Sequence, residues 1–181
     1  MQPDPRTAFM QAYAPCHEPF ARYCAALAFG RMEVEDLMQD VLLSAFRQFD
    51  RIQRKDQLLH YLIRAARNRA ASEWRLASRT EAMREKQLGH IRDKGTPAEV
   101  LVDVGLLYAE LDRLPAKQRE ALVLFEVSGL SMEEIADIQG VKANAIKTRV
   151  SRARTALRAR LEGRARPNAA KLLNTMASLM L

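Results

Sequence analysis

The stretch SMEEIADIQGVKANAIKTRVSRARTALRARL, residues 131–161, is the most informative part of this sequence about structure. Ser131 and Glu134 have the spacing of a capping box, in which each side chain accepts a hydrogen bond from the other residue's backbone N–H. Gly140 suits the left-handed turn after this short helix, since a residue without a Cβ adopts positive φ at no steric cost. A longer helix over 142–161 should follow.

The longer helix has two contrasting faces. Its inner stripe consists of Ile146, Val150, Ala153, Leu157 and Leu161. Its outer face consists of Asn144, Lys147, Thr148, Ser151, Arg154, Thr155 and Arg158. A short helix, a glycine turn and a basic helix form the pattern of a helix-turn-helix, whose second helix enters the major groove of DNA.

The outer face divides into candidate base readers and candidate phosphate contacts. Asn144 can form a bidentate pair with adenine, and Lys147 can donate to guanine. The residues better placed for phosphates are Arg149, Arg152, Arg154 and Arg158. A purely structural helical bundle is the alternative, but nine basic residues against one acid in 138–166 would repel one another without benefit to such a bundle.

Helical spacing extends over most of the chain. Apolar residues recur at steps of three and four over 34–49 and again over 58–75, which predicts two amphipathic helices. Two further helices are expected at 97–113 and 116–127; a capping box formed by Thr96 and Glu99 begins the first of them. With few β-branched runs, the chain is predicted to be all-α.

The helix over 58–75 carries a second face that is basic and aromatic. This face consists of His60, Arg64, Arg67, Trp74 and Arg75. Stacking on bases combined with phosphate pairing is what single-stranded nucleic acid requires of a protein. A solvated basic face with Trp74 packed inward is the alternative.

Charge alternates along the chain in blocks. The net charge is −3 over 1–50, +7 over 51–94, −6 over 99–137 and +8 over 138–166. Two acidic-then-basic alternations suggest two binding modules, each with a face for an anion. The overall charge of +7 favours a polyanionic partner.

Several classes of protein are excluded at this stage. No basic start followed by an apolar run forms a signal peptide, and no stretch approaches the ~20 apolar residues of a membrane span, so we expect neither a secreted nor a membrane-inserted protein. Cys16, His17 and Cys24 are candidate metal ligands, but no second CxxC or HxxxH completes a tetrahedral site. Buried reduced thiols are therefore expected, with no metal and no cofactor.

Two sets of motifs carry a resemblance to a known family. In 111–161 they are Leu114-Pro115, Gln118-Arg119, Glu134-Ile135-Ala136 and Arg152-Ala153-Arg154. In 36–75 they are Asp36-Leu37, Gln39-Asp40, Ala45-Phe46, Leu62, Arg64 and Arg67-Asn68. The first set resembles region four, and the second region two, of bacterial sigma-70-type RNA polymerase sigma factors, specifically the small extracytoplasmic-function (ECF) group.

The resemblance implies a cytoplasmic, two-domain protein that binds core RNA polymerase and directs promoter recognition and −10 melting, with no catalysis of its own. Residues 1–83 would be region two, 84–96 the linker, 97–166 region four and 167–181 an apolar tail. An anti-sigma factor is an expected partner, beside core polymerase and promoter DNA.

The resemblance also implies roles by position. For duplex −35 DNA the residues are Lys142, Asn144, Lys147, Thr148, Arg149, Ser151, Arg152, Arg154 and Arg158. For the single-stranded −10 element they are His60, Tyr61, Arg64, Arg67, Asn68, Trp74 and Arg75. For core polymerase they are Asp36, Leu37, Gln39, Asp40, Leu43 and Phe46. The chain departs from the family's usual residues at Tyr61 (Trp), Ser72 (Asp) and Ala145 (Thr).

Alternatives remain open beside this interpretation. One is a polymerase-independent regulator that uses only the helix-turn-helix, and another is a hydrolase that uses acids such as Asp36 and Asp40. The apolar stripe in the tail is formed by Leu172, Leu173, Met176, Leu179 and Met180. It either docks on the C-terminal domain, or frays, or regulates access of a partner or DNA.

Overall fold

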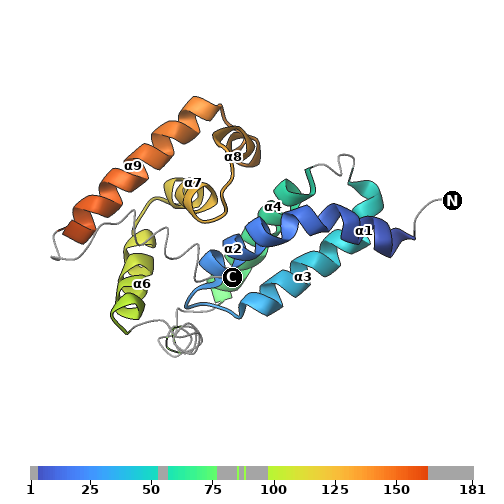
Figure 1. Cartoon of the computed structure of the whole chain (residues 1–181), viewed down its shortest axis with the longest axis horizontal. Coiled ribbons are helices and arrows are strands. Elements are labelled where there is room, and N and C mark those ends of the chain that lie inside the picture. Colours follow the sequence, from blue (N-terminus) through green and yellow to red (C-terminus); the bar gives the residue numbers. More distant parts are fainter. Residues whose placement is uncertain (1–3, 53–56, 77–84, 86–87, 89–97, 163–181) are drawn as a thin grey trace.

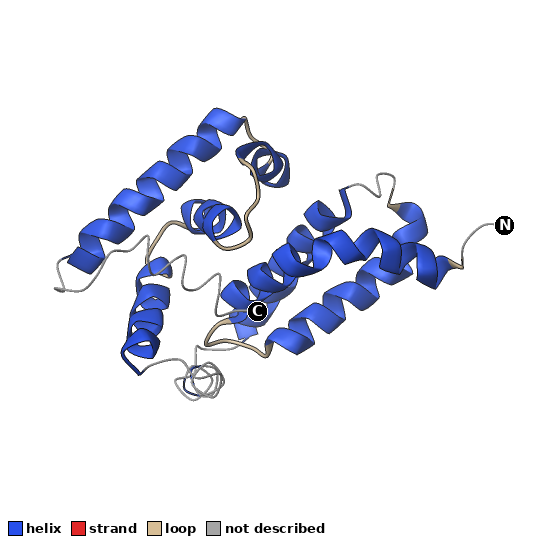
Figure 2. Ribbon diagram, viewed as in Figure 1, coloured by secondary structure: helices blue, strands red, loops and turns tan. Residues whose placement is uncertain are grey.

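The computed structural model of this protein describes residues 4–52, 57–76, 85, 88 and 98–162. Figure 1 shows two groups of helices that lie against each other, one built from α1 to α4 and the other from α6 to α9. No strand occurs within these described ranges, as the colouring of Figure 2 makes plain. The predicted all-helical fold is confirmed.

The first group follows the apolar spacing of the sequence. Its helices are α1 (Pro5–Tyr13), α2 (His17–Ala28), α3 (Val34–Arg47) and α4 (Leu58–Leu76), with 3-10 turns at Ala14–Cys16 and Phe49–Arg51. The helix expected over 34–49 ends at Arg47, because Gln48 leaves the helical region with φ −107° and ψ 4°. Phe49 is nevertheless buried, and its ring packs at 5.2 Å from that of Phe9.

The second group contains the predicted helix-turn-helix. Its helices are α6 (Ala98–Leu111), α7 (Ala116–Glu126), α8 (Met132–Gln139) and α9 (Ala143–Glu162). The Ser131–Glu134 capping box is formed in both directions at the start of α8, and Gly140 has φ 66° at its end. The capping box therefore determines where α8 begins, and Gly140 determines where it ends and how the chain turns into α9.

Helix α6 ends at Leu111, two residues before the expected end at Arg113. The backbone N–H groups of Arg113 and Leu114 donate to carbonyls only three residues earlier, so the last turn tightens before Pro115. The expected capping residue Thr96, the linker apart from residues 85 and 88, and the tail 167–181 lie outside the described residues.

The buried residues of both groups form one continuous core. The inner stripe predicted for α9, from Ile146 to Leu161, is at most 2% exposed at each position. The rings of Phe29, after α2, and Tyr108, in α6, stack across the junction with centroids 3.8 Å apart and planes 11° from parallel. The two groups are therefore joined by apolar packing as well as by charge.

Candidate nucleic-acid interface

The outer face of α9 is open to solvent. Burial of the inner stripe against α7 and α8 leaves the opposite side of the helix exposed. The predicted residues that are exposed on it are Lys142, Asn144, Lys147, Thr148, Ser151, Arg152, Arg154 and Arg158. A solvent-facing helix that begins just after a tight turn has the geometry that a recognition helix requires.

Some polar groups of α9 are engaged within the protein. Arg154 pairs with Glu126 and lies over the ring of Phe125, with its guanidinium carbon 5.2 Å from the ring centre. Arg149 is half-buried and donates to the side-chain oxygen of Gln139 at the end of α8. The hydroxyl of Thr148 donates to the carbonyl of Asn144 at 3.0 Å, which leaves the Asn144 side-chain amide for other partners.

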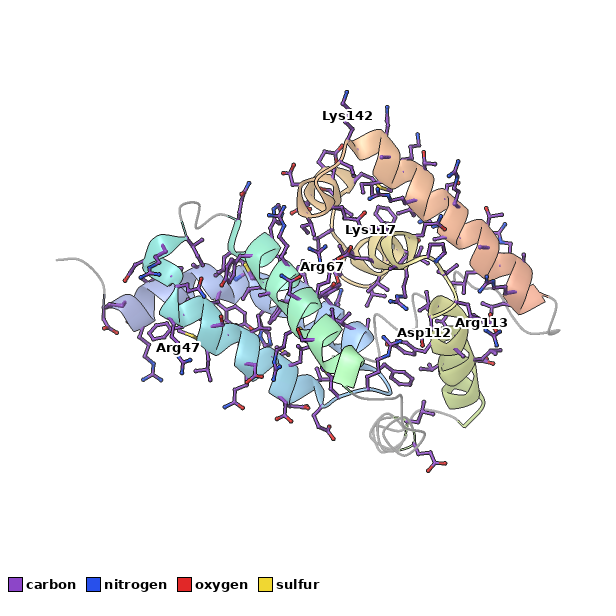
Figure 3. All side chains as sticks on the ribbon, turned by 180° about the vertical axis from the view of Figure 1, so that it is seen from behind. Arg47, Arg67, Asp112, Arg113, Lys117 and Lys142 are labelled. Atoms are coloured by element: carbon purple, nitrogen blue, oxygen red, sulfur yellow. The ribbon has the colours of Figure 1, made fainter. Side chains whose placement is uncertain are left out.

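The basic face of α4 has a different environment. Arg64 donates through Nε to the carbonyl of Ile138 at 3.3 Å and through a terminal nitrogen to the carbonyl of Asp137. Arg67 donates to Oε1 of Glu120 at 3.1 Å, and Figure 3 shows it between α4 and α7. Both arginines are therefore engaged by the second group of helices.

The carbonyls that Arg64 meets belong to the C-terminal end of α8. Backbone carbonyls in the last turn of a helix lack intrahelical partners and carry the negative end of the helix dipole. The Arg64 guanidinium gives two of these carbonyls a hydrogen-bond donor and places a positive charge at the negative end of the α8 dipole. This contact holds the middle of α4 against the helix-turn-helix.

A hollow of about 370 Å³ opens beside the first turns of α4. Its lining residues are Gln48, Arg51, Ile52, Gln57, His60, Tyr61 and Arg64. Three of these, His60, Tyr61 and Arg64, are among the residues predicted for single-stranded DNA. Asn68 is exposed one turn further along, whereas the side chains of Trp74 and Arg75 lie outside the described part of the structure.

The exposed side of α3 combines acids with apolar side chains. Asp36, Gln39 and Asp40 are exposed, and Leu43 and Phe46 are 47% and 41% exposed. Leu37 differs from the other residues predicted for this surface, because it is only 2% exposed and packs in the core. Its role is therefore to hold α3 in place.

Met10 was not anticipated on this side of the molecule. It is 53% exposed on α1, and the neighbouring Phe9 ring lies edge-on to that of Phe46 at 5.4 Å. The α1 segment was given no surface role from sequence. Its apolar spacing alone does not separate a core methionine from an exposed one.

An acidic residue just after α6 and one in α7 join the two groups of helices. Glu120 accepts from Arg67 and from the Gln139 side chain, the latter at 2.9 Å. Asp112 pairs with Arg31 at 2.9 Å and with Arg119 at 3.1 Å. Sequence reasoning missed these positions, although the −6 block over 99–137 was a signal that acids collect there.

Burial shifts the ionisation of groups at this junction. Burial and the neighbouring charge of Arg119 lower the pKa of Arg31, and burial lowers that of Arg119. Burial and the nearby Glu120 carboxylate raise the pKa of Tyr23. Arg31 and Arg119 are both partly buried and both pair with Asp112. Loss of this carboxylate would leave two buried positive charges without their shared partner.

The thiols of the described residues are buried, and no metal-binding cluster accompanies them there. Cys16 and Cys24 are buried, as expected, and burial raises the pKa of both thiols, which keeps them protonated and unreactive. Among the described residues, no group of three or more His, Cys, Asp or Glu side chains is arranged to hold a metal ion. None of the described helices is long and apolar enough to cross a membrane.

Comparison with known families identifies both groups of helices. The family model of Sigma-70 region 2 matches residues 13–80, and that of Sigma-70, region 4 matches residues 105–157. The ECF RNA polymerase sigma factor EcfG of Rhodopseudomonas palustris is 33% identical over 141 residues, which is 77% of this chain and 77% of that protein. The ECF sigma factor SigC of Mycobacterium tuberculosis is 33% identical over 132 residues, 71% of this chain and 70% of the relative.

Two solved structures share this fold. The sigma factor RpoE of Bartonella quintana, crystallised in complex with the anti-sigma factor NepR, is 29% identical, with a TM-score of 0.62 over 86% of this chain and 97% of that one. CnrH, solved in complex with the cytosolic domain of CnrY, has a TM-score of 0.64 at 24% identity and supports the fold alone. With both sigma regions present in order and a relative matched over most of its length, this chain belongs to the ECF family of RNA polymerase sigma factors.

Proposed function

We propose that this sigma factor divides promoter recognition between α9, which reads duplex −35 DNA, and α4, which holds the opened −10 strand, while α3 binds core RNA polymerase. A sigma factor catalyses no reaction itself; it gives the polymerase its promoter. The observation that carries this assignment is the largely exposed polar and basic face of α9 opposite a buried apolar stripe. Residues 1–83 would serve the polymerase and the −10 element, and 97–166 the −35 element.

In the −35 interface, the first turns of α9 are the reading segment. Asn144 and Lys147 have exposed side chains there, and these two residue types form the most specific contacts with adenine and guanine edges. Exposed Arg152 and Arg158 lie further along the helix and suit phosphates, which fix the register of the helix in the groove. Lys142, in the turn before α9, would contact a DNA phosphate at the N-terminal end of the helix.

In the −10 interface, an extruded base would enter the hollow beside α4. Its volume of about 370 Å³ lies within the range of small-molecule sites, which begins near 300 Å³. His60 and Tyr61 offer rings for stacking, and Arg64 at its edge offers a phosphate contact. These contacts must offset the few kcal/mol that unstacking a base costs.

In the polymerase interface, α3 offers a mixed surface. Exposed Leu43 and Phe46 provide apolar area, and Asp36, Gln39 and Asp40 surround it with polar groups. A protein interface has the same composition, with an apolar centre and a polar rim. Met10 extends the apolar area onto α1.

The two groups of helices must separate for α4 to act. Arg64 and Arg67, both proposed to contact the −10 strand, now donate to Asp137 and Glu120 in the second group. A guanidinium that is already paired cannot meet a phosphate without releasing its partner. Polymerase binding, which sets the distance between −10 and −35 modules, is the step that would supply this release.

An anti-sigma factor is the expected negative regulator. RpoE of Bartonella quintana was solved in complex with the anti-sigma factor NepR, and the exposed side of α3 would be available for the same kind of contact here. The site of action would be the cytoplasm, where the polymerase and the chromosome are found.

The test is run-off transcription from a fragmented genomic template with sigma-free core polymerase, in the presence and absence of this protein. Discrete new start sites that share upstream sequence elements are expected. Phe46→Asp should remove them by blocking polymerase binding, whereas Glu133→Gln, an exposed change on α8 outside the three proposed interfaces, is the control. Sequence-specific duplex binding without any start site would instead indicate a polymerase-independent regulator.

A further inference from the structure

An apolar cavity of about 290 Å³ lies where the two groups of helices meet. The first group contributes Tyr23, Ala26, Leu27 and Ala71 to its wall, and the second contributes Tyr108, Leu111, Ala116 and Val123. An engineered apolar cavity of about 150 Å³ holds one benzene molecule. This cavity therefore has room for about two aliphatic side chains.

The edge of the cavity carries four cations and two acids, Arg31, Arg67, Lys117 and Arg119 against Asp112 and Glu120, and both acids are engaged in ion pairs. Arg67 pairs with Glu120, and Arg31 and Arg119 both pair with Asp112. Because both acids of the edge are already paired, a cation would lose its hydration there without a new counter-charge, and the wall between the two groups suits apolar side chains. None of the surfaces proposed for the polymerase or for DNA uses the apolar wall.

The chain itself contains a segment of suitable chemistry. Residues 167–181, which lie outside the described part of the structure, read PNAAKLLNTMASLML and contain one charged residue, Lys171. The residues Leu172, Leu173, Met176, Leu179 and Met180 recur at steps of three and four, the spacing of one helix face. Leucine and methionine are the side-chain types that a cavity of this size and polarity accepts.

The end of α9 places this segment within reach of the cavity. Arg160, in the last turn of α9, has a terminal nitrogen 3.9 Å from Oε2 of Glu110 in α6. Tyr108 and Leu111, which line the cavity, lie within two residues of Glu110 on the same helix. Residues 163–167 can span up to about 17 Å when extended, which exceeds the roughly 10 Å diameter of a helix.

We propose that the segment 168–181 docks by its apolar stripe in this cavity between the two groups of helices. A helix that lies over the cavity and inserts two side chains of its stripe would touch α2 and α4 on one side and α6 and α7 on the other. It therefore stabilises the arrangement in which Arg64 and Arg67 are held by the second group. Given the function proposed above, tail docking restrains promoter engagement until the polymerase separates the groups.

The first test compares two double variants of the full chain by hydrogen exchange. Leu172→Asp with Met176→Asp places charge on the stripe, and Asn174→Asp with Ser178→Asp places the same charge on the opposite face. We expect the stripe variant to exchange about tenfold faster at the amides of α2 and α7 that line the cavity, and the control to match the wild type. Equal exchange in all three proteins would overturn the proposal.

The second test traps the docked segment covalently. In the full chain carrying Met176→Cys and Ala71→Cys, mild oxidation should give an intramolecular disulfide, while Ser178→Cys with Ala71→Cys should give much less. The native thiols are buried and do not compete. A disulfide between two copies would instead assign the cavity to a second chain and overturn the proposal, as would the absence of any disulfide.

The regulatory consequence has its own readout. With core polymerase, the stripe variant should give several-fold more transcript than the wild type at limiting polymerase. An unchanged yield beside altered exchange would confine the tail to a structural role and overturn the restraint. Failure of the proposed sigma function is distinguishable from both outcomes, because then no variant gives any transcript.

Discussion

The helices α4 and α9 present similar basic faces in very different states. The α9 face lies in solvent, with exposed Asn144 and Lys147 in its first turns. On α4, Arg64 and Arg67 donate to carbonyl and carboxylate oxygens of the other group of helices. Similar composition therefore does not give similar availability, because availability depends on what the rest of the fold brings opposite each face. Under the proposed function, the α9 face is open to duplex DNA, whereas the α4 face must first be released from the second group.

The largest effect is expected on the available side of this comparison. Lys147→Ala, in a complex with core polymerase, should lose about 1–3 kcal/mol of binding at promoters that carry its preferred base, and little elsewhere. Selection of −35 sequences from a randomised library measures this directly. Lys117→Ala, an exposed lysine outside α9, is the control. A uniform loss at all sequences would make Lys147 a phosphate contact instead of a base reader.

The second prediction tests whether the left-handed turn at Gly140 sets the orientation of α9. Gly140→Ala should destabilise the second group of helices by about 1–2 kcal/mol, because φ 66° is strained for any residue with a Cβ. No atom lies within 4 Å of the added Cβ, so the backbone conformation alone sets the cost.

The matched control is Gly105→Ala, within α6. The added Cβ meets Cδ1 of Leu88 at 3.7 Å, an ordinary contact, and replacing a helical glycine by alanine should stabilise the protein by about 0.5–1 kcal/mol. Thermal unfolding measures both changes. Equal effects of the two substitutions would contradict the assignment of α9 orientation to the left-handed turn.

How far the sequence predicts this molecule is clearest at the same two helices. The capping box at Ser131, the turn at Gly140 and the inner stripe of α9 were all predicted and are all present, because each signal acts within a few residues. The engagement of Arg67 by Glu120 was not predicted. These residues lie 53 positions apart, and no local rule pairs them.

Exposure was also harder to predict than helical structure. Leu37 and Leu43 both lie on α3 and both entered the predicted polymerase surface, yet they are 2% and 47% exposed. Helical periodicity assigns each residue to a face, but which neighbouring helix covers that face is a tertiary property. The site residues named from the resemblance to sigma factors therefore remain predictions until they are substituted one by one.

The third prediction breaks the restraint on α4. Glu120→Gln keeps the shape of the side chain and removes the charge that Arg67 meets. The pair is partly exposed at Arg67 (32%) and largely buried at Glu120 (9%), so we expect a modest effect of about 1 kcal/mol. That corresponds to about fivefold tighter binding of the isolated protein to a labelled single-stranded −10 oligonucleotide.

The control for this prediction is Glu133→Gln, which removes the same charge from an exposed position of α8. If both variants gain equally, the effect is one of net charge and the Arg67–Glu120 pair does not restrain α4. If neither gains, the two groups of helices already separate freely in solution.

The smallest effect concerns two neighbouring arginines of α9. One is exposed, like most of the α9 face, and the other is engaged within the protein, like the arginines of α4. Arg152 is exposed, whereas Arg149 is half-buried and donates to Gln139. Each phosphate contact contributes about 0.9 to the slope of log affinity against log salt, or about 3.5-fold in affinity for a fourfold change in salt. Arg152→Ala should therefore flatten the slope by nearly one unit in duplex −35 binding. Arg149→Ala should do so fully only if Gln139 releases its guanidinium when DNA binds. If Arg152→Ala flattens the salt slope by a full unit and Arg149→Ala by much less, the contact between Arg149 and Gln139 persists on DNA. In that case α8 holds one arginine of the α9 face away from the phosphates, although the rest of that face is largely exposed.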